Sequence, residues 1–217
     1  MKTFLSIGSG PGMGLATAKR FAKEGFHVIL SARNEAKTKA LADQLKSQGY
    51  KVSVRTVDTA DPASVAALVT NVEREFGTID VLHYNAASMR KATLDEQALD
   101  SFNSDLAVNI GGAQAAAKSG APKMIERGAG TILLTGGGFG LYPHPDYLSL
   151  SIGKAGIRAL AQGLFESFKQ KGVHIATVTV AGFVDPGSQH ADAVAEQFWQ
   201  LHSQRKEAWT VEATYTP

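Results

Sequence analysis

The sequence predicts a doubly wound α/β fold, with helices on both faces of a parallel sheet of about seven strands. Apolar, β-branched runs alternate strictly with segments of helical periodicity along the chain. A glycine-rich turn, Gly8-Ser9-Gly10-Pro11-Gly12-Met13-Gly14, joins the first such run to the first helical segment. Strict alternation favours parallel strands, because each helix carries the chain back to the same edge of the sheet. We therefore expect three layers, α/β/α.

The individual elements follow from the period of the apolar residues. Strands are predicted at 3–7, 27–32, 51–57, 79–84, 130–135 and 173–180, with a weaker last strand at 208–215. Helices are predicted at 13–24, 35–48, 62–76, roughly 97–127, 152–171 and 191–203. No repeat or linker interrupts the pattern, so we expect one domain over residues 1–217.

Composition narrows the function classes. The chain has 217 residues, 44% of them hydrophobic, and a net charge of +2 with Lys and Arg scattered along it. Neither a nucleic-acid nor a membrane partner is expected from such a charge pattern. The absence of cysteine excludes disulfides and thiolate metal sites, and no histidines have zinc-ligand spacing, so we expect no metal. The chain starts directly into a strand pattern, and we expect a cytoplasmic protein.

The glycine-rich turn is typical of a phosphate-binding site. Glycine permits the tight turn and lets the backbone approach an anion closely, and the following helix offers unpaired N–H groups and a partial positive charge. We expect Gly8, Gly10, Gly12, Met13 and Gly14 to bind the pyrophosphate of a dinucleotide. The alternative is a tight turn with a purely structural role.

The loop after the second strand indicates which dinucleotide binds. It has the sequence Ser31-Ala32-Arg33-Asn34, where proteins that prefer NAD usually carry an acidic residue for the ribose hydroxyls. A guanidinium can pair with a 2′-phosphate and stack on adenine, so Arg33 favours NADP(H) over NAD(H). The alternative is an ordinary solvated arginine at a helix start.

The spacing Gly8-x-x-x-Gly12-x-Gly14 resembles that of the short-chain dehydrogenase/reductases, a family with a Rossmann-type fold. Further similar stretches occur in the family's order: Val57-Asp58, Asn85-Ala86-Ala87, Val108-Asn109, Lys154-Ala155-Gly156 and Ala181-Gly182-Phe183-Val184. The resemblance covers nearly the whole chain. It implies that Asp58 meets the adenine amino group, that Asn85, Ala86, Gly182 and Val184 border the cofactor, and that Asn109 and Lys154 are catalytic.

Two departures from the family fall at its catalytic positions. The family's tyrosine lies four residues before the lysine, where this chain has Leu150, and its serine corresponds to Gly137. A positioned proton donor typically supplies about 10²–10⁴-fold in rate, and losing an oxyanion donor costs roughly 3–4 kcal/mol. Tyr147, about two helical turns before Lys154, is the candidate substitute acid. Its alternative role is a packed aromatic at a helix entry.

The sequence thus predicts an NADP(H)-dependent oxidoreductase that transfers hydride to a small carbonyl or imine with an atypical proton donor. The alternative is an NADP(H)-binding protein without redox turnover, such as a sensor or a degenerate subunit, and a non-redox reaction in the same pocket is a third option. Two helical segments rich in Ala and Gly, near 111–117 and 156–163, could pack closely against a second copy. The resemblance implies a homodimer or homotetramer.

Overall fold

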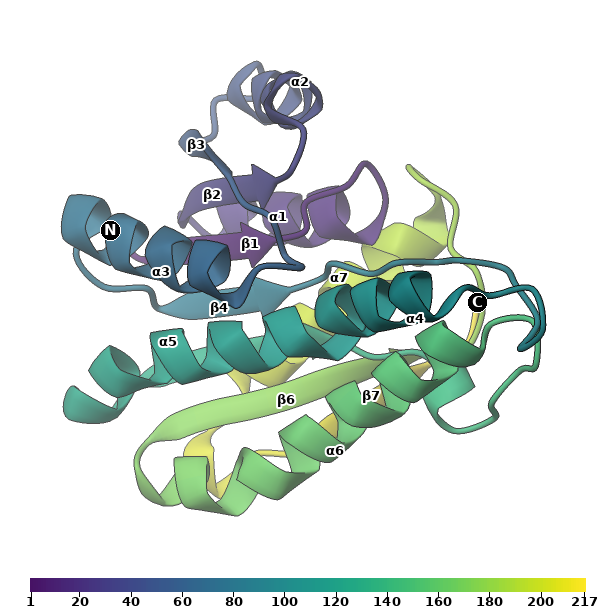
Figure 1. The fold of residues 1–217 in the computed structure, drawn as a ribbon. Helices are drawn as coiled ribbons and strands as arrows, with labels where there is room; N and C mark the ends of the chain where they lie inside the picture. The colour runs from purple at the N-terminus through teal and green to yellow at the C-terminus, as the bar shows by residue number, and fades with distance from the viewer.

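The computed structural model describes all 217 residues and contains one parallel sheet in the order β3-β2-β1-β4-β5-β6-β7 (Figure 1). The predicted α/β fold is therefore confirmed. The strands are β1 Thr3–Ile7, β2 His27–Ala32, β3 Val52–Thr56, β4 Val81–Tyr84, β5 Gly130–Thr135, β6 Val173–Val180 and β7 Glu212–Tyr215. All seven lie within the ranges predicted from the apolar runs.

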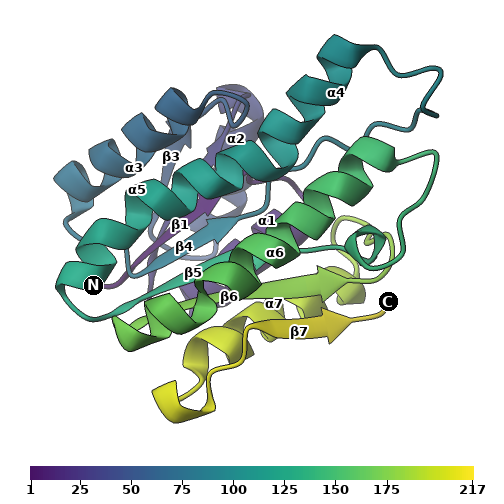
Figure 2. The same cartoon turned by 60° about the horizontal axis from the view of Figure 1, so that its bottom comes forward.

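Helices cover both faces of the sheet, as Figure 2 shows after rotation. One layer holds α1 Met13–Lys23, α2 Glu35–Lys46 and α7 Gln189–Ser203; the other holds α3 Pro62–Phe76, α4 Leu99–Leu106, α5 Gly112–Glu126 and α6 Leu148–Gln170. None of these helices is both long and apolar enough to cross a membrane.

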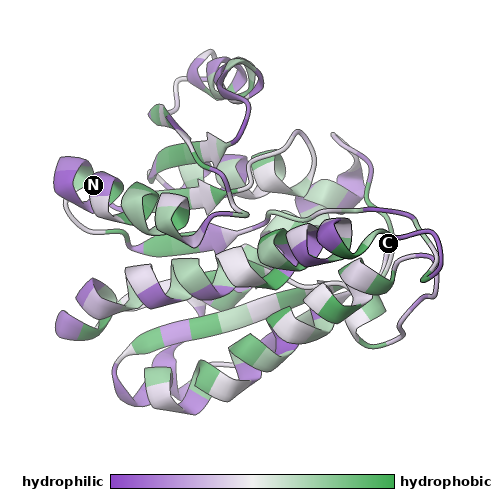
Figure 3. Ribbon diagram, in the orientation of Figure 1, coloured by the Kyte–Doolittle hydropathy of each residue, from purple (hydrophilic) through white to green (hydrophobic).

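Two apolar cores lie between the sheet and its helix layers. Successive residues of a strand face opposite sides, so Phe4 packs with α1, α2 and α7, whereas Leu5 and Ile7 pack with α3, α5 and α6. Hydropathy mapped on the ribbon shows apolar strands inside and polar outer helix faces (Figure 3). The amphipathic periods of the sequence therefore account for the layer structure.

One predicted helix is interrupted. The segment expected at roughly 97–127 consists of α4, a π-helical segment Ala107–Gly111, and α5. The buried Tyr84 hydroxyl donates a hydrogen bond to the Val108 carbonyl at 2.6 Å, which gives that carbonyl a partner outside the helix. A π-helical segment inside a helix often marks a functional site. Another helix, α6, begins at Leu148, four residues earlier than predicted.

The strand order creates a crevice at one edge of the sheet. β1 pairs with β2 on one side and with β4 on the other, so the connections after β1 and β4 diverge. Ligands of open parallel sheets bind at such a switch point, beyond the carboxyl ends of the strands. In Figure 1 these ends point toward the right of the molecule.

Candidate active site

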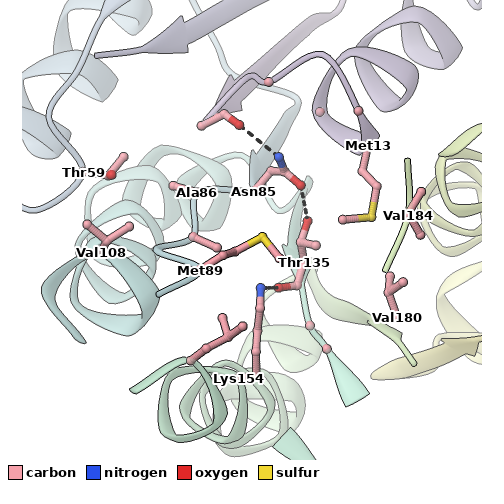
Figure 4. A pocket seen from close by; sticks show the side chains of 18 of the residues that line it. Met13, Thr59, Asn85, Ala86, Met89, Val108, Thr135, Lys154, Val180 and Val184 are labelled. Carbon is pink, nitrogen blue, oxygen red and sulfur yellow. Dashed lines mark hydrogen bonds between the residues drawn. The ribbon is translucent and has the colours of Figure 1, made fainter. Parts of the chain in front are cut away.

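A cavity of about 470 Å³ lies at the carboxyl ends of the strands. Loops after β1 to β6 all contribute to its wall, together with the start of α1 and the first two turns of α6. Its volume falls within the usual range for cofactor and small-molecule sites. Figure 4 shows the side chains that surround it.

The glycine-rich turn forms one wall of this cavity. Gly8 has a φ of +85°, and a Cβ there would overlap the backbone of Ala86, so the turn packs directly on the loop after β4. The backbone N–H groups of Gly8 and Ser9 both donate to the Ser31 carbonyl at 2.9 Å. Only glycine satisfies both the backbone conformation and the close approach.

The helix that follows the turn presents an uncompensated N-terminus to the cavity. Gly12 caps α1 with no side-chain hydrogen bond, and the first turn contains no acidic residue. Gly8, Gly10, Gly12, Met13 and Gly14 all line the cavity, and their contact with a pyrophosphate stays a prediction. The exposed N–H groups and the helix dipole therefore remain available to an anion.

Arg33 lies on the cavity wall next to Ala32, but Asp58 does not. The Asp58 side chain is exposed, and its carboxylate accepts a hydrogen bond from the Ala60 backbone N–H at 3.0 Å. Its neighbours Val57 and Thr59 line the cavity instead. The expected contact between Asp58 and adenine thus stays a prediction, whereas the loop itself lies at the site.

Asn85 links the ends of three strands. Its Nδ2 donates to the Gly8 carbonyl at 2.9 Å, and its Oδ1 accepts from Thr135 Oγ1 at 3.0 Å. Because the Thr135 proton is used there, the His83 Nε2, 3.1 Å away, is the donor to the same hydroxyl. Burial, followed by the charge of Lys154, lowers the pKa of His83 to about 3. His83 is therefore neutral and holds the floor of the site rigid.

Asn109 lies within the π-helical segment and is almost completely buried. Its Oδ1 accepts from the Ser88 N–H at 2.6 Å, and its Nδ2 donates to the Ser88 carbonyl at 3.2 Å. Both ends of the amide are thus engaged by the segment after β4. Asn109 does not line the cavity; its neighbour Val108 does.

Lys154 extends from α6 toward the end of β5, where its Nζ donates to the Thr135 carbonyl at 2.7 Å (Figure 4). Burial lowers the pKa of this ammonium to about 8, since desolvation penalises the charged form. A Cβ on Gly137 would come within 3.2 Å of the Lys154 Cγ. Leu150, one turn earlier on α6, presents an alkyl group to the cavity.

Tyr147, the predicted substitute acid, caps the start of α6 and does not line the cavity. Its ring stacks on Phe139 at a centroid distance of 5.2 Å and lies 6.1 Å from the ring of Phe183. Phe139 and Phe183 themselves border the cavity. Tyr147 therefore belongs to an aromatic cluster behind the wall, which is the arrangement of its alternative role.

A buried carboxylate outside the cavity holds together two segments that form the cavity wall. Asp105 on α4 is 2% exposed and accepts hydrogen bonds from Ser88 Oγ at 2.5 Å, Arg90 Nε at 2.9 Å and Ser149 Oγ at 3.0 Å. Burial opposes its ionisation, but hydrogen bonds from Arg90, Ser88 and Ser149 outweigh burial and lower its pKa. Asp105 thus ties the segment after β4 to the start of α6, beside Leu150.

Sequence reasoning located most of the cavity and missed part of its wall. The predicted Asn85, Ala86, Gly182 and Val184 line it. Residues not predicted as site residues are Ser9, Ala32, Val57, Thr59, Ala87, Met89, Val108, Thr135, Gly136, Gly137, Gly138, Phe139, Leu150, Val180 and Phe183. Most of these lie at strand ends or in the loops that follow, a location that could have singled them out. The structure contains no group of three His, Asp or Glu side chains that could hold a metal ion.

Comparison with known families agrees with this geometry. The family described as short chain dehydrogenase matches residues 2–197, which is most of the chain. The chain belongs to the short-chain dehydrogenase family. Its fold, its glycine turn and its cavity at the strand ends are the features expected of an oxidoreductase of that family.

Several characterised relatives of this short-chain dehydrogenase are oxidoreductases. A 2,5-dichloro-2,5-cyclohexadiene-1,4-diol dehydrogenase of Sphingobium indicum is 26% identical over 185 residues, 85% of this chain and 74% of the relative. A glucose 1-dehydrogenase of Gluconobacter oxydans is 29% identical over 187 residues, 85% of this chain and 70% of the relative. These substrates differ widely, so the relatives support the reaction class only.

Solved structures show the same architecture over the full chain. A short-chain dehydrogenase from Rhodopseudomonas palustris superposes with a TM-score of 0.90 and 26% identity, covering 100% of this chain and 98% of that one. A metagenomic short-chain oxidoreductase in complex with NADP has a TM-score of 0.89 and 24% identity, covering 100% and 97%. At 24% identity, the similarity to the metagenomic oxidoreductase supports the fold alone.

Proposed function

We propose that this short-chain dehydrogenase uses NADP(H) to reduce a small carbonyl or imine, with a proton donor other than the family's tyrosine. The observation that carries the proposal is the single cavity wall shared by the glycine turn, Arg33 and Lys154. The relatives' oxidoreductase activities support the same reaction class. Bound NADPH would supply the hydride; the protein supplies binding, orientation and electrostatics.

The residues present fit a phosphorylated dinucleotide. The uncapped N-terminus of α1 faces the cavity, with the backbone of Gly10 and Gly12 beside it. Nothing lies within 4 Å of a Cβ built on Gly10, so an anion can approach the main chain there. Arg33 adds a positive charge where the loop after β2 forms the cavity wall, and its guanidinium can donate two hydrogen bonds to a 2′-phosphate there. A homologous fold in complex with NADP is consistent with this choice.

Lys154 and Asn109 have different roles in the part of the cavity where hydride transfer would occur. The Lys154 ammonium, fixed on the Thr135 carbonyl, would donate a second N–H to one hydroxyl of the nicotinamide ribose and favour negative charge nearby. Asn109 holds Ser88 through two hydrogen bonds and thereby positions the segment that carries Met89. The facing wall is apolar, with Leu150, Phe139 and Val180, which suits a substrate with a hydrocarbon or aromatic body.

Titration of the protein with NADPH and NADH tests the cofactor assignment. We expect a clear preference for NADPH that disappears in Arg33→Ala, because a charge-assisted contact to phosphate contributes about 1.5–3 kcal/mol. That loss corresponds to roughly 10- to 150-fold in dissociation constant, with little change for NADH. Lys37→Ala, also exposed but on the first turn of α2 beyond the cavity, is the control. Equal affinity for both cofactors in the unmodified protein would contradict the NADP(H) assignment.

An alternative function, NADP(H) binding without turnover, is favoured by Leu150 and Gly137 at the family's tyrosine and serine positions. The two functions are separated by cofactor oxidation with 4-nitrobenzaldehyde, an aliphatic diketone and a cyclic imine. A reductase consumes NADPH in the presence of at least one acceptor, and consumption falls sharply in Lys154→Ala. A sensor or degenerate subunit binds NADPH tightly and oxidises none with any acceptor.

We also propose that the protein assembles as a homodimer or homotetramer through α5 and α6. Ala155 and Ala159 on α6 are exposed small residues that permit close approach of another helix, whereas the alanines Ala115 and Ala117 of α5 are used within this chain's own core. Ile152 on the same helix is an exposed apolar side chain. Light scattering coupled to gel filtration should give a mass of at least twice 22.9 kDa. A mass of one chain would contradict this assembly.

A further inference from the structure

We infer that the Lys154 ammonium itself delivers the proton to the reduced substrate and so takes over the work of the family's missing tyrosine. The inference rests on the proposed reductase function and deepens it. It assigns Lys154 a chemical step in addition to binding the cofactor and stabilising charge.

The first argument is an inventory of the cavity wall. Apart from Lys154, its only titratable side chain is Arg33, which lies with Ala32 at the end of β2. Arginine does not give up its proton in proteins. The hydroxyls on the wall belong to Ser9, Thr59 and Thr135, which are poor acids, and the first and last of these are engaged in hydrogen bonds. Lys154 is therefore the one effective acid that reaches the cavity.

The second argument is the geometry around the amine. A lysine ammonium has three N–H donors, and the Thr135 carbonyl takes one at 2.7 Å. The other two N–H groups have no protein partner. Gly137 places no side chain beside the lysine stem, and Leu150 places no hydroxyl between the amine and the cavity. Two N–H groups of this ammonium are therefore available to a ligand in the cavity that Lys154 lines.

The third argument is that the surroundings contain no charge to keep the proton on the amine. His83 on β4 is neutral at physiological pH, and Asn109 and the Gly136–Gly138 loop carry no charge. Arg158, one turn later on α6, pairs with Glu212 of β7 at 2.9 Å. Asp105, behind the wall, is paired with Arg90. Burial without a carboxylate partner lowers the pKa of Lys154 to about 8, close to the range suited to acid catalysis at neutral pH.

The step balances with the hydride that bound NADPH would supply and a proton that Lys154 supplies. As hydride reaches the carbonyl carbon, the π pair of the C=O bond moves onto oxygen. One Nζ–H bond of Lys154 breaks while the new O–H bond forms, which leaves alcohol and neutral amine. Lys154 then regains a proton from water in the open cavity before the next turnover.

Two acceptors of different proton demand test the inference. Reduction of 4-nitrobenzaldehyde needs one hydride and one proton, whereas reduction of the N-methyl-3,4-dihydroisoquinolinium cation needs hydride alone. At saturating NADPH we expect Lys154→Met to lower kcat for the aldehyde by about 10²–10⁴-fold and to change kcat for the iminium far less. Lys46→Met, exposed on α2, is the matched control and should change neither. NADPH affinity is measured separately for each variant.

A pH series and a direct titration complete the test. For aldehyde reduction kcat should be level below pH 8 and fall tenfold per pH unit above it, and Lys154→Arg should abolish this break. Lysine side-chain NMR of the cofactor-free protein should show one amine titrating near pH 8 that is absent in Lys154→Met.

Each contrary result overturns the assignment in a distinguishable way. Equal losses for aldehyde and iminium in Lys154→Met would reduce Lys154 to a cofactor-binding residue while leaving the reductase function standing. A pH break that persists in Lys154→Met but disappears in Tyr147→Phe would assign the proton to Tyr147. An NMR midpoint above pH 10 would also overturn the role, and absence of turnover with every acceptor would overturn both this role and the proposed function.

Discussion

Replacing Lys154 with methionine should change how the stability of the protein depends on pH. The folded chain holds this amine in a site that lowers its pKa to about 8, from an ordinary value of 10.5 that the unfolded chain retains. Between these values the unfolded state binds a proton that the folded state has released. The free energy of unfolding therefore receives a contribution that rises with pH in this interval.

The size of the effect follows from the two pKa values. At about 1.4 kcal/mol per pH unit, the full interval corresponds to about 3 kcal/mol of stability that is missing below pH 8 and recovered above pH 10. Water in the open cavity reduces this figure, so it is an upper limit. Methionine fills a similar volume without an amine, and the variant lacks this contribution at every pH. The hydrogen bond to the Thr135 carbonyl is lost as well, which adds an offset to the comparison.

Urea unfolding of the cofactor-free protein, followed by the fluorescence of Trp199 and Trp209, measures the effect from pH 7 to pH 10. The stability difference between the unmodified protein and Lys154→Met should change by about 2–3 kcal/mol over this range, in favour of the unmodified protein at high pH. Tyr84, whose pKa is raised by burial, titrates in both proteins and cancels in the difference. Lys46→Met should run parallel to the unmodified protein. Parallel curves for Lys154→Met would refute the reasoning, because they would mean that the cavity solvates the ammonium as water does.

Four further substitutions test how the site is held together. Gly8→Ala should destabilise the fold by at least about 2 kcal/mol in urea unfolding, because alanine disfavours the positive φ of position 8 and the alanine Cβ would overlap the loop after β4. An unchanged stability would mean that the turn rearranges freely. Gly153→Ala should lower the free energy of unfolding by about 1–3 kcal/mol, because the alanine Cβ would overlap Asn109. Gly163→Ala, which has open space on the same helix, should raise it by up to about 1 kcal/mol. Equal effects of the two substitutions would contradict the close contact at Gly153. Asp105→Asn should cost about 1–3 kcal/mol and speed proteolysis after residue 88, since an amide cannot accept all of its present hydrogen bonds; unchanged cleavage would show that Asp105 does not hold that segment.

Much of the architecture could be read from local patterns. Strand and helix periods are properties of neighbouring residues, so the alternation of elements predicted the parallel sheet and the edge at which the loops gather. The turn at Gly8–Gly14 and the arginine after the second strand were located in the same way. The interruption of the helix at Ala107–Gly111 was not, because its cause is a tyrosine hydroxyl on β4.

Functional assignments at the reacting end depended on packing between distant segments. From spacing alone, Tyr147 shares a helix face with Lys154, yet it caps α6 just before the helix begins and its ring stacks on Phe139. Asp105 gave no signal in the sequence, since its partners Ser88, Arg90 and Ser149 lie in two other segments, up to 44 residues away. The assignment of Leu150 and Gly137 to the positions of the family's tyrosine and serine, by contrast, came from the sequence and stays a prediction.

The sequence by itself determined the fold class and the glycine turn that borders the cavity, and it predicted Leu150 and Gly137 at the positions that the resemblance assigns to the family's tyrosine and serine. Those features depend on residue type and on spacing within one segment. The tertiary structure alone decided the environment of Lys154, because its burial and its hydrogen bond to the Thr135 carbonyl at the end of β5 depend on segments distant in the sequence. The pKa of an acidic group depends on its surroundings, and those of Lys154 form only after the sheet and its helices have packed together.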